Sequence, residues 1–245
     1  MSISLPVELE AIAEELNYEH GRLIYEGVGG NEVRRSILPG GVRVITEKMP
    51  GTRGVSIGFW VGVGSRDEAP GMLGSTHFLE HLLFKGTGTR TALDIASSFD
   101  AVGGESNALT AKEHTCYYAR VLDDDAPMAV DVITDMVTNA LLDPAHLEQE
   151  RGVILEEIAM DQDDPTDVAF ENFGGQLMGE NALGRPIGGT PQEITEVPRD
   201  AVWEHYKRYY TPDRLVISAA GSLEHSTMVR LVLESLTRYG WDLRE

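Results

Sequence analysis

Three side chains that could bind a metal or transfer a proton lie within five consecutive residues. They are His77, Glu80 and His81, in the run His-Phe-Leu-Glu-His. Ser75 or Thr76 can cap the start of a helix and a glycine downstream can end it, which predicts a short apolar helix across this run. Positions i and i+4 of an α-helix lie about 40° apart around the axis, so both histidines point the same way. The helix therefore presents two imidazoles that can bind one metal ion, with the carboxylate of Glu80 beside them.

Zinc suits this pair of histidines, because neutral imidazole is one of its usual ligands; Mn²⁺ or Co²⁺ could occupy the same groups. A catalytic zinc typically keeps three protein ligands and leaves a fourth position open, so a third ligand must come from elsewhere in the chain. Glu80 lies between the histidines, where it can accept a proton from a water at the metal. The order H-x-x-E-H is typical of the inverzincin metallopeptidases.

A second group of carboxylates lies on the helix predicted over residues 145–160, which carries Glu148, Glu150, Glu156 and Glu157. The usual interpretation of such a set is a solvated helix face. Glu150 and Glu157 are seven residues apart, however, and so share one stripe of the helix to within about 20°. Both could face the metal.

Composition excludes several classes of partner. The chain has 245 residues, 42% of them hydrophobic, and a formal net charge of −20. That charge argues against nucleic acid and anionic membranes as partners and would attract cationic peptides. The single Cys116 excludes a disulfide within one chain and a multi-cysteine zinc site. No apolar run is long enough to span a bilayer, and the acidic N-terminus resembles neither a signal nor a transit peptide, so we expect a cytoplasmic protein.

The remaining pattern predicts an α+β fold, a two-layer arrangement with a mainly antiparallel sheet and helices packed on one face. Strands are expected at 33–38 and 42–47, joined by a Pro-Gly-Gly hairpin, and at 55–63, 105–110, 115–122 and 215–220. Helices are expected at 7–16, 92–102, 128–142, 145–160, 167–178, 200–209 and 225–236.

Three stretches of the chain resemble the N-terminal half of the M16 metallopeptidases, which include pitrilysin, insulin-degrading enzyme and the mitochondrial processing peptidase. The stretches are 58–86, 103–115 and 150–158, and the match extends from about residue 33 to the last helix. Three motifs in the same order are far more specific than one pentamer. The resemblance implies an M16 peptidase N-terminal-type domain over residues 31–245, after an acidic extension over residues 1–30.

The resemblance also implies roles for single residues. His77, His81 and Glu157 would be the zinc ligands. Glu80 would be the catalytic base. Glu150 would also take part in catalysis, as an acidic neighbour of the metal ligands. Glu156 is the alternative third ligand, but it points about 100° away from Glu157 and does not share the stripe of Glu150.

The strand expected at 105–110 resembles the family's edge strand beside the zinc, on which an extended peptide substrate lies as an added strand. Asn107 and Ala108 would contact that substrate. The implied activity is a zinc-dependent endopeptidase that cleaves short or unfolded peptides. A plain sheet edge is the alternative interpretation of this strand.

The chain departs from the family in length, because family polypeptides usually hold two similar halves that close like a clamshell. Only one half is recognised here, which implies a C-terminal half or an M16-type partner subunit, and a homodimer or a heterodimer of such halves. Two other classes remain open. One is a non-catalytic partner or scaffold subunit. The other is an enzyme like S-ribosylhomocysteine lyase, which has the same H-x-x-E-H order but takes a cysteine ligand, for which Cys116 is the candidate.

Overall fold

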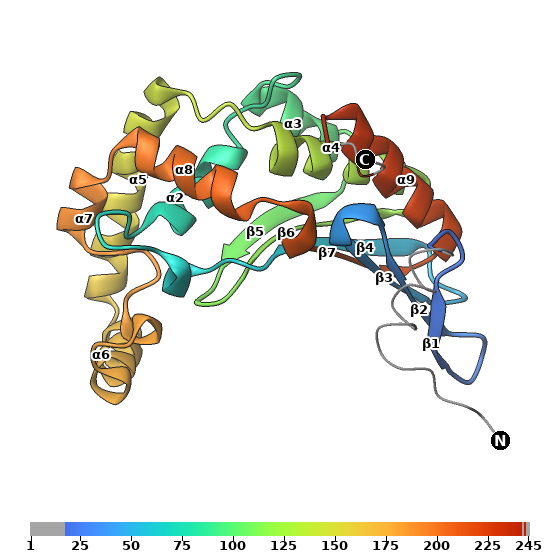
Figure 1. The fold of residues 1–245 in the computed structure, drawn as a ribbon, viewed down its shortest axis with the longest axis horizontal. Coiled ribbons are helices and arrows are strands. Elements are labelled where there is room, and N and C mark those ends of the chain that lie inside the picture. The colour runs from blue at the N-terminus through green and yellow to red at the C-terminus, as the bar shows by residue number, and fades with distance from the viewer. Residues whose placement is uncertain (1–17, 242, 244–245) are drawn as a thin grey trace.

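The computed structural model describes residues 18–241 and residue 243, which form a seven-stranded sheet with a layer of helices over one face (Figure 1). The order across the sheet is β1-β2-β3-β7-β4-β6-β5, so β1 and β5 are the edges. The strands are β1 (Arg22–Glu26), β2 (Glu32–Ile37), β3 (Arg43–Lys48), β4 (Gly54–Val61), β5 (Glu105–Thr110), β6 (Thr115–Leu122) and β7 (Leu215–Gly221).

The sheet is antiparallel throughout except where β3 and β7 run parallel. The last strand in sequence, β7, therefore lies in the middle of the sheet, between β3 and β4. Residues of β4 alternate in burial except at Gly58, which is buried between Ile57 and Phe59, and the side chains of Ile57 and Phe59 lie in the core. This alternation of period two is what directs one face of the sheet to the helices.

The helical layer consists of elements that vary widely in length. The helices are α2 (Ser75–Leu83), α3 (Ala92–Asp100), α4 (Ala126–Asn139), α5 (Pro144–Asp163), α6 (Pro165–Met178), α7 (Pro191–Glu196), α8 (Arg199–Tyr209) and α9 (His225–Arg238). Short 3₁₀ turns are η1 (Pro39–Gly41), η2 (Ser65–Asp67), η3 (Asp123–Asp125), η4 (Ala182–Gly184) and η5 (Pro212–Arg214).

Two groups of helices cover different parts of the sheet (Figure 1). The helices α4 and α9 pack on each other and on β3, β4 and β6. The helix α2 instead packs between α5 and α8, close to the edge strand β5. One continuous apolar core joins both groups. As a result, the predicted metal-binding helix is fixed by its neighbours and lies beside an open sheet edge.

The α+β fold with a mainly antiparallel sheet and helices on one face is confirmed. The sequence did not predict β1, which lies inside the range 1–30 assigned to an extension and pairs antiparallel with β2. The six-residue helix α7 was also not predicted. The helix expected at 7–16 lies outside the described residues. None of the helices among residues 18–241 combines the length and apolarity that crossing a bilayer requires.

Candidate metal centre

The helix α2 buries one face and turns its polar side chains to the other. Phe78, Leu79, Leu82 and Leu83 are buried in the core, whereas the two histidines and Glu80 are half-buried. The expectation that Ser75 or Thr76 caps this helix is wrong. Both are inside its first turn, and the residue that precedes the helix is Gly74, which has no capping side chain.

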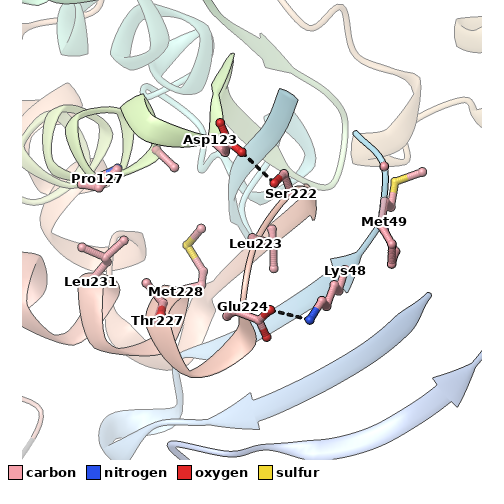
Figure 2. Close-up of a pocket in the computed structure, with 13 residues that line it drawn as sticks. Lys48, Met49, Asp123, Pro127, Ser222, Leu223, Glu224, Thr227, Met228 and Leu231 are labelled. Carbon is pink, nitrogen blue, oxygen red and sulfur yellow. Dashed lines mark hydrogen bonds and ion pairs between the residues drawn. The ribbon is translucent and has the colours of Figure 1, made fainter. Parts of the chain in front are cut away.

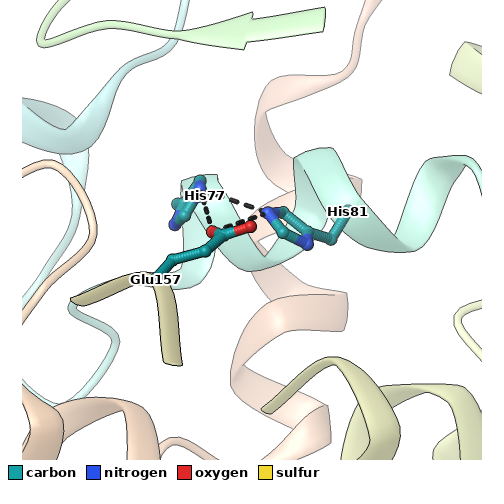
Figure 3. A group of neighbouring side chains, drawn as sticks. All are labelled: His77, His81 and Glu157. Carbon is teal, nitrogen blue, oxygen red and sulfur yellow. Dashed lines mark hydrogen bonds and ion pairs between the residues drawn. The ribbon is translucent and has the colours of Figure 1, made fainter. Parts of the chain in front are cut away.

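The structure brings His77, His81 and Glu157 together, the last reaching across from α5 (Figure 3). The two Nε2 atoms are 3.2 Å apart. Glu157 Oε2 lies 3.4 Å from Nε2 of His81 and 3.7 Å from Nε2 of His77. Among the described residues this is the group of histidine, cysteine and carboxylate side chains close enough to share a metal ion.

These separations fit zinc. Donor atoms around one tetrahedral Zn²⁺, each about 2.0 to 2.1 Å from the ion, lie about 3.3 Å from one another. The three measured separations of 3.2, 3.4 and 3.7 Å are close to that value. Two imidazoles and one carboxylate are also a usual donor set for a catalytic zinc that keeps a fourth position open.

Glu150 contacts the ring nitrogen of His81 that faces away from Glu157. Its Oε2 atom lies 3.0 Å from Nδ1 of His81, and its side chain is only 3% exposed. The ammonium of Lys85 lies 2.8 Å from the other carboxylate oxygen, close enough for an ion pair although the angles do not make a hydrogen bond. A carboxylate that accepts from Nδ1–H of a histidine fixes the tautomer and leaves Nε2 free to bind a metal.

His77 has a different environment. Its Nδ1 atom is buried and has no hydrogen-bond partner among the described residues. Burial lowers the pKa of His77, the neighbouring His81 lowers it further, and Glu157 and Asp161 act in the opposite direction. Burial therefore disfavours the protonated ring, and the neutral ring is the form that binds a metal.

Glu80 points from α2 towards the edge strand, where its Oε2 atom accepts a hydrogen bond from the hydroxyl of Thr110. A hollow of about 820 Å³ opens beside it, lined in part by Glu80, His81, Glu157 and Asn107. The carboxylate thus lies in the same space as two of the three metal-binding candidates.

The edge strand β5 carries the two residues predicted to contact substrate. Its side chains alternate between exposed and half-buried positions, as expected of an edge. The side chain of Asn107 accepts a hydrogen bond of 2.8 Å from the backbone N–H of Ala108. That N–H is therefore directed away from β6, to the side on which another strand could add.

The alternative ligands are not brought to the centre. Glu156 is exposed and is not in the group of three. Cys116 is buried on β6, opposite Trp60, and is likewise outside that group. Burial raises the pKa of its thiol to about 12 and so disfavours the thiolate, the form that binds metals.

Two residues of the site were missed in the sequence. Lys85 is four residues after His81, just past the end of α2, and a helix continued that far would place both on one face, a spacing that could have signalled it. Thr110 ends the edge strand, and its contact with Glu80 depends on how far α2 lies from β5. No spacing within the sequence reports that distance.

A second hollow, of about 330 Å³, lies beside α9, on the other side of the molecule from α2 (Figures 1 and 2). Its walls are mainly apolar, including Pro127, Leu223 and Met228. Its charged groups are paired, Lys48 with Glu224 and Asp123 with the hydroxyl of Ser222. The described residues that line it include no histidine, and none of them belongs to the group that could hold a metal ion.

Residues 43–191 match the family model described as Insulinase (Peptidase family M16). The chain belongs to peptidase family M16. It is 51% identical to an uncharacterized zinc protease of Streptomyces coelicolor over 87% of this chain and 46% of that protein. It is 35% identical to a probable mitochondrial-processing peptidase subunit beta of Arabidopsis thaliana over 86% of this chain and 40% of that protein.

Solved structures agree with this membership. A putative M16-like peptidase from Alicyclobacillus acidocaldarius aligns with a TM-score of 0.77 and 25% identity, over 85% of this chain and 50% of that one. A protease from Helicobacter pylori aligns with a TM-score of 0.80 and 21% identity, over 84% of this chain and 50% of that one, and shows the shared fold. The chain spans about half the length of the M16 relatives that it matches.

Proposed function

We propose that this chain is the zinc-binding half of an M16 endopeptidase. The observation that carries the proposal is the group of His77, His81 and Glu157, whose donor atoms have the mutual spacing that one tetrahedral ion requires. The presence of Glu80 in the adjoining hollow adds a base at the same place.

Zinc, when bound by these three residues, would polarise the scissile carbonyl and make a water more acidic. Glu80 accepts a proton from the attacking water and later delivers it to the leaving amine. Thr110 holds one oxygen of that carboxylate and so restricts its orientation. Glu150 accepts from Nδ1–H of His81 and keeps the Nε2 lone pair directed at the ion.

The substrate in this proposal is a peptide in extended form, paired with β5. Ala108 offers a backbone N–H at the free edge once the side chain of Asn107 releases it. Backbone pairing of this kind recognises an extended shape more than a sequence, which suits short or unfolded peptides. The net charge of −20 favours cationic peptides during encounter.

A second half of M16 type completes the site in this proposal, either from the same polypeptide or from a partner subunit. All the residues proposed above lie between positions 77 and 157, and the hollow beside them is open on one side. Positioning of the substrate contributes several kcal/mol to catalysis, so the isolated chain should bind zinc but cleave peptides slowly. Full turnover of a fluorogenic peptide by residues 1–245, unchanged by adding a second half, would contradict this part of the proposal.

The test of the catalytic assignment is Glu80→Gln in the protein supplied with its second half. The variant removes the base without removing a ligand, so we expect normal zinc content and a fall in kcat of about 10²- to 10⁴-fold. Glu156→Gln is the matched control, because Glu156 is exposed and should affect neither quantity. Loss of zinc from Glu80→Gln would show that Glu80 is a ligand and not the base.

A further inference from the structure

The helix that carries both histidines begins without a cap of its own. The preceding residue, Gly74, has φ +84° and no side chain that could accept from the free N–H groups of the first turn. A helix leaves its first N–H groups without intrahelical partners, and an uncapped start tends to fray. Since His77 is the third residue of α2, fraying would displace it first.

Glu68 supplies the missing cap from a distance. It follows the 3₁₀ turn η2, and its two carboxylate oxygens accept from the backbone N–H of Gly74 at 2.8 Å and of Thr76 at 2.7 Å. Glu68 is only 5% exposed. A carboxylate at a helix N-terminus also interacts favourably with the helix dipole.

The capping segment is itself held by other parts of the fold. The guanidinium of Arg185 donates to the backbone carbonyl of Glu68 at 3.0 Å. Tyr209, on α8, donates its hydroxyl hydrogen to the carbonyl of Asp67 at 2.9 Å. The hydroxyl of Thr76 lies 3.0 Å from Nε2 of His205, which is also on α8. Burying a carboxylate costs free energy, so we expect the position of Glu68 to serve a purpose in the fold.

We propose that Glu68 is a positioning residue for the metal centre: its carboxylate caps α2 and keeps His77 in register with His81, so that both imidazoles can bind one ion. The inference rests on the proposed function, because it assigns Glu68 to the same zinc site. If only a fraction of molecules holds His77 in place, the apparent zinc dissociation constant rises by the inverse of that fraction. Glu68 therefore acts through the start of the helix and not by touching the ion.

The experiment measures the zinc dissociation constant by chelator competition at about pH 8, where the carboxylate of Glu68 is ionised. We expect Glu68→Ala to weaken zinc binding about tenfold, the equivalent of losing a strong helix cap. Glu68→Gln keeps the shape and one acceptor oxygen, so it should lie between Glu68→Ala and the wild type. Circular dichroism and thermal unfolding establish that each variant is folded.

The matched control is Asp94→Ala. Asp94 completes the capping box of α3, accepting from the N–H of Thr91 at 2.9 Å, and α3 carries no proposed ligand. This variant should lose a helix cap and some stability while binding zinc as the wild type does. Equal weakening of zinc binding by Asp94→Ala would show that the effect is general destabilisation and would overturn the proposal.

Hydrogen exchange in the metal-free protein tests the cap separately from zinc. We expect the amides of Gly74, Thr76 and the first turn of α2 to exchange faster in both Glu68 variants. Their exchange rates in Asp94→Ala should equal those of the wild type. Folded Glu68 variants with wild-type exchange, or with wild-type zinc affinity, would overturn the proposal. A wild-type chain that binds no zinc would contradict the proposed function and with it the zinc-positioning role. Hydrogen exchange would still show whether Glu68 caps α2.

Discussion

Four histidines of this chain lie in two contrasting environments. His205 and His225 are only 2% and 6% exposed and have hydroxyl partners. The ring of His225 lies 2.7 Å from the hydroxyls of both Ser36 and Thr46, so both of its nitrogens are occupied. His77 and His81 are half-buried, face a carboxylate, and direct their Nε2 atoms at each other. The same side chain is thus a core residue in one place and a candidate ligand in the other.

The difference shows what makes a histidine available to a metal. Burial lowers the pKa of His205 and of His225 to about 4, so both rings are neutral at neutral pH, yet neither belongs to a group of side chains spaced to share a metal ion. Neutrality alone therefore does not define a ligand. His77 and His81 differ from His205 and His225 in two respects: their nitrogen atoms lie close enough to Glu157 to share one ion, and a hollow adjoins them.

The largest expected effect is that of His81→Ala. Removing a direct ligand should cost more zinc affinity than the roughly 10- to 100-fold that loss of an outer partner costs, and should abolish peptidase activity. His225→Ala is the contrasting variant and should keep its zinc. Metal analysis of both purified proteins checks this prediction, and zinc retention by His81→Ala would contradict the ligand assignment.

A smaller effect is expected from Glu150→Gln. The amide can still reach Nδ1 of His81 but no longer carries the charge that pairs with Lys85, so zinc should bind about tenfold more weakly. Glu148→Gln, an exposed carboxylate on the same helix, is the control. An unchanged dissociation constant in Glu150→Gln would show that His81 needs no support from this carboxylate.

The stability of the metal-free protein should depend on pH through its core histidines. Because the folded pKa of His225 is about 4 and the unfolded value is about 6.5, the unfolded state binds more protons between these values, and stability is lost as pH falls through that window. The slope of unfolding free energy against pH should be steeper in the wild type than in His225→Gln by about 1.4 kcal/mol per unit. Exposed His20→Gln is the control, and denaturant titrations at several pH values give the slopes.

An effect of similar size, on turnover, concerns the orientation of the base. Thr110→Val keeps the shape of the side chain but removes the hydroxyl that donates to Glu80, a bond worth about 1.5 to 3 kcal/mol when the acceptor is charged. We expect kcat to fall about tenfold with KM and zinc content nearly unchanged. Thr115→Val does not serve as a control because Thr115 is buried and pairs directly with Thr110 across β5 and β6. Thr52→Val, exposed and away from α2, does. An unaltered kcat would show that Glu80 is oriented without Thr110.

The sequence predicted what depends on local spacing. The i, i+4 histidines and the seven-residue separation of Glu150 and Glu157 placed these side chains on two helix faces, and the structure brings those faces together. It did not predict β1, whose five residues are all exposed and so lack the alternation that marks a strand. Glu68 was also missed, because its role depends on a loop folding back to a helix start six residues later.

The most direct test of the zinc centre is X-ray absorption at the zinc edge, measured on the purified chain loaded with one equivalent of zinc. We expect two imidazole nitrogens and carboxylate oxygen at about 2.0 to 2.2 Å from the ion, with the oxygen contribution from the protein reduced in Glu157→Gln. A zinc–sulfur distance of about 2.3 Å would instead point to Cys116, and coordination unchanged by replacing Glu157 would contradict the three-residue centre.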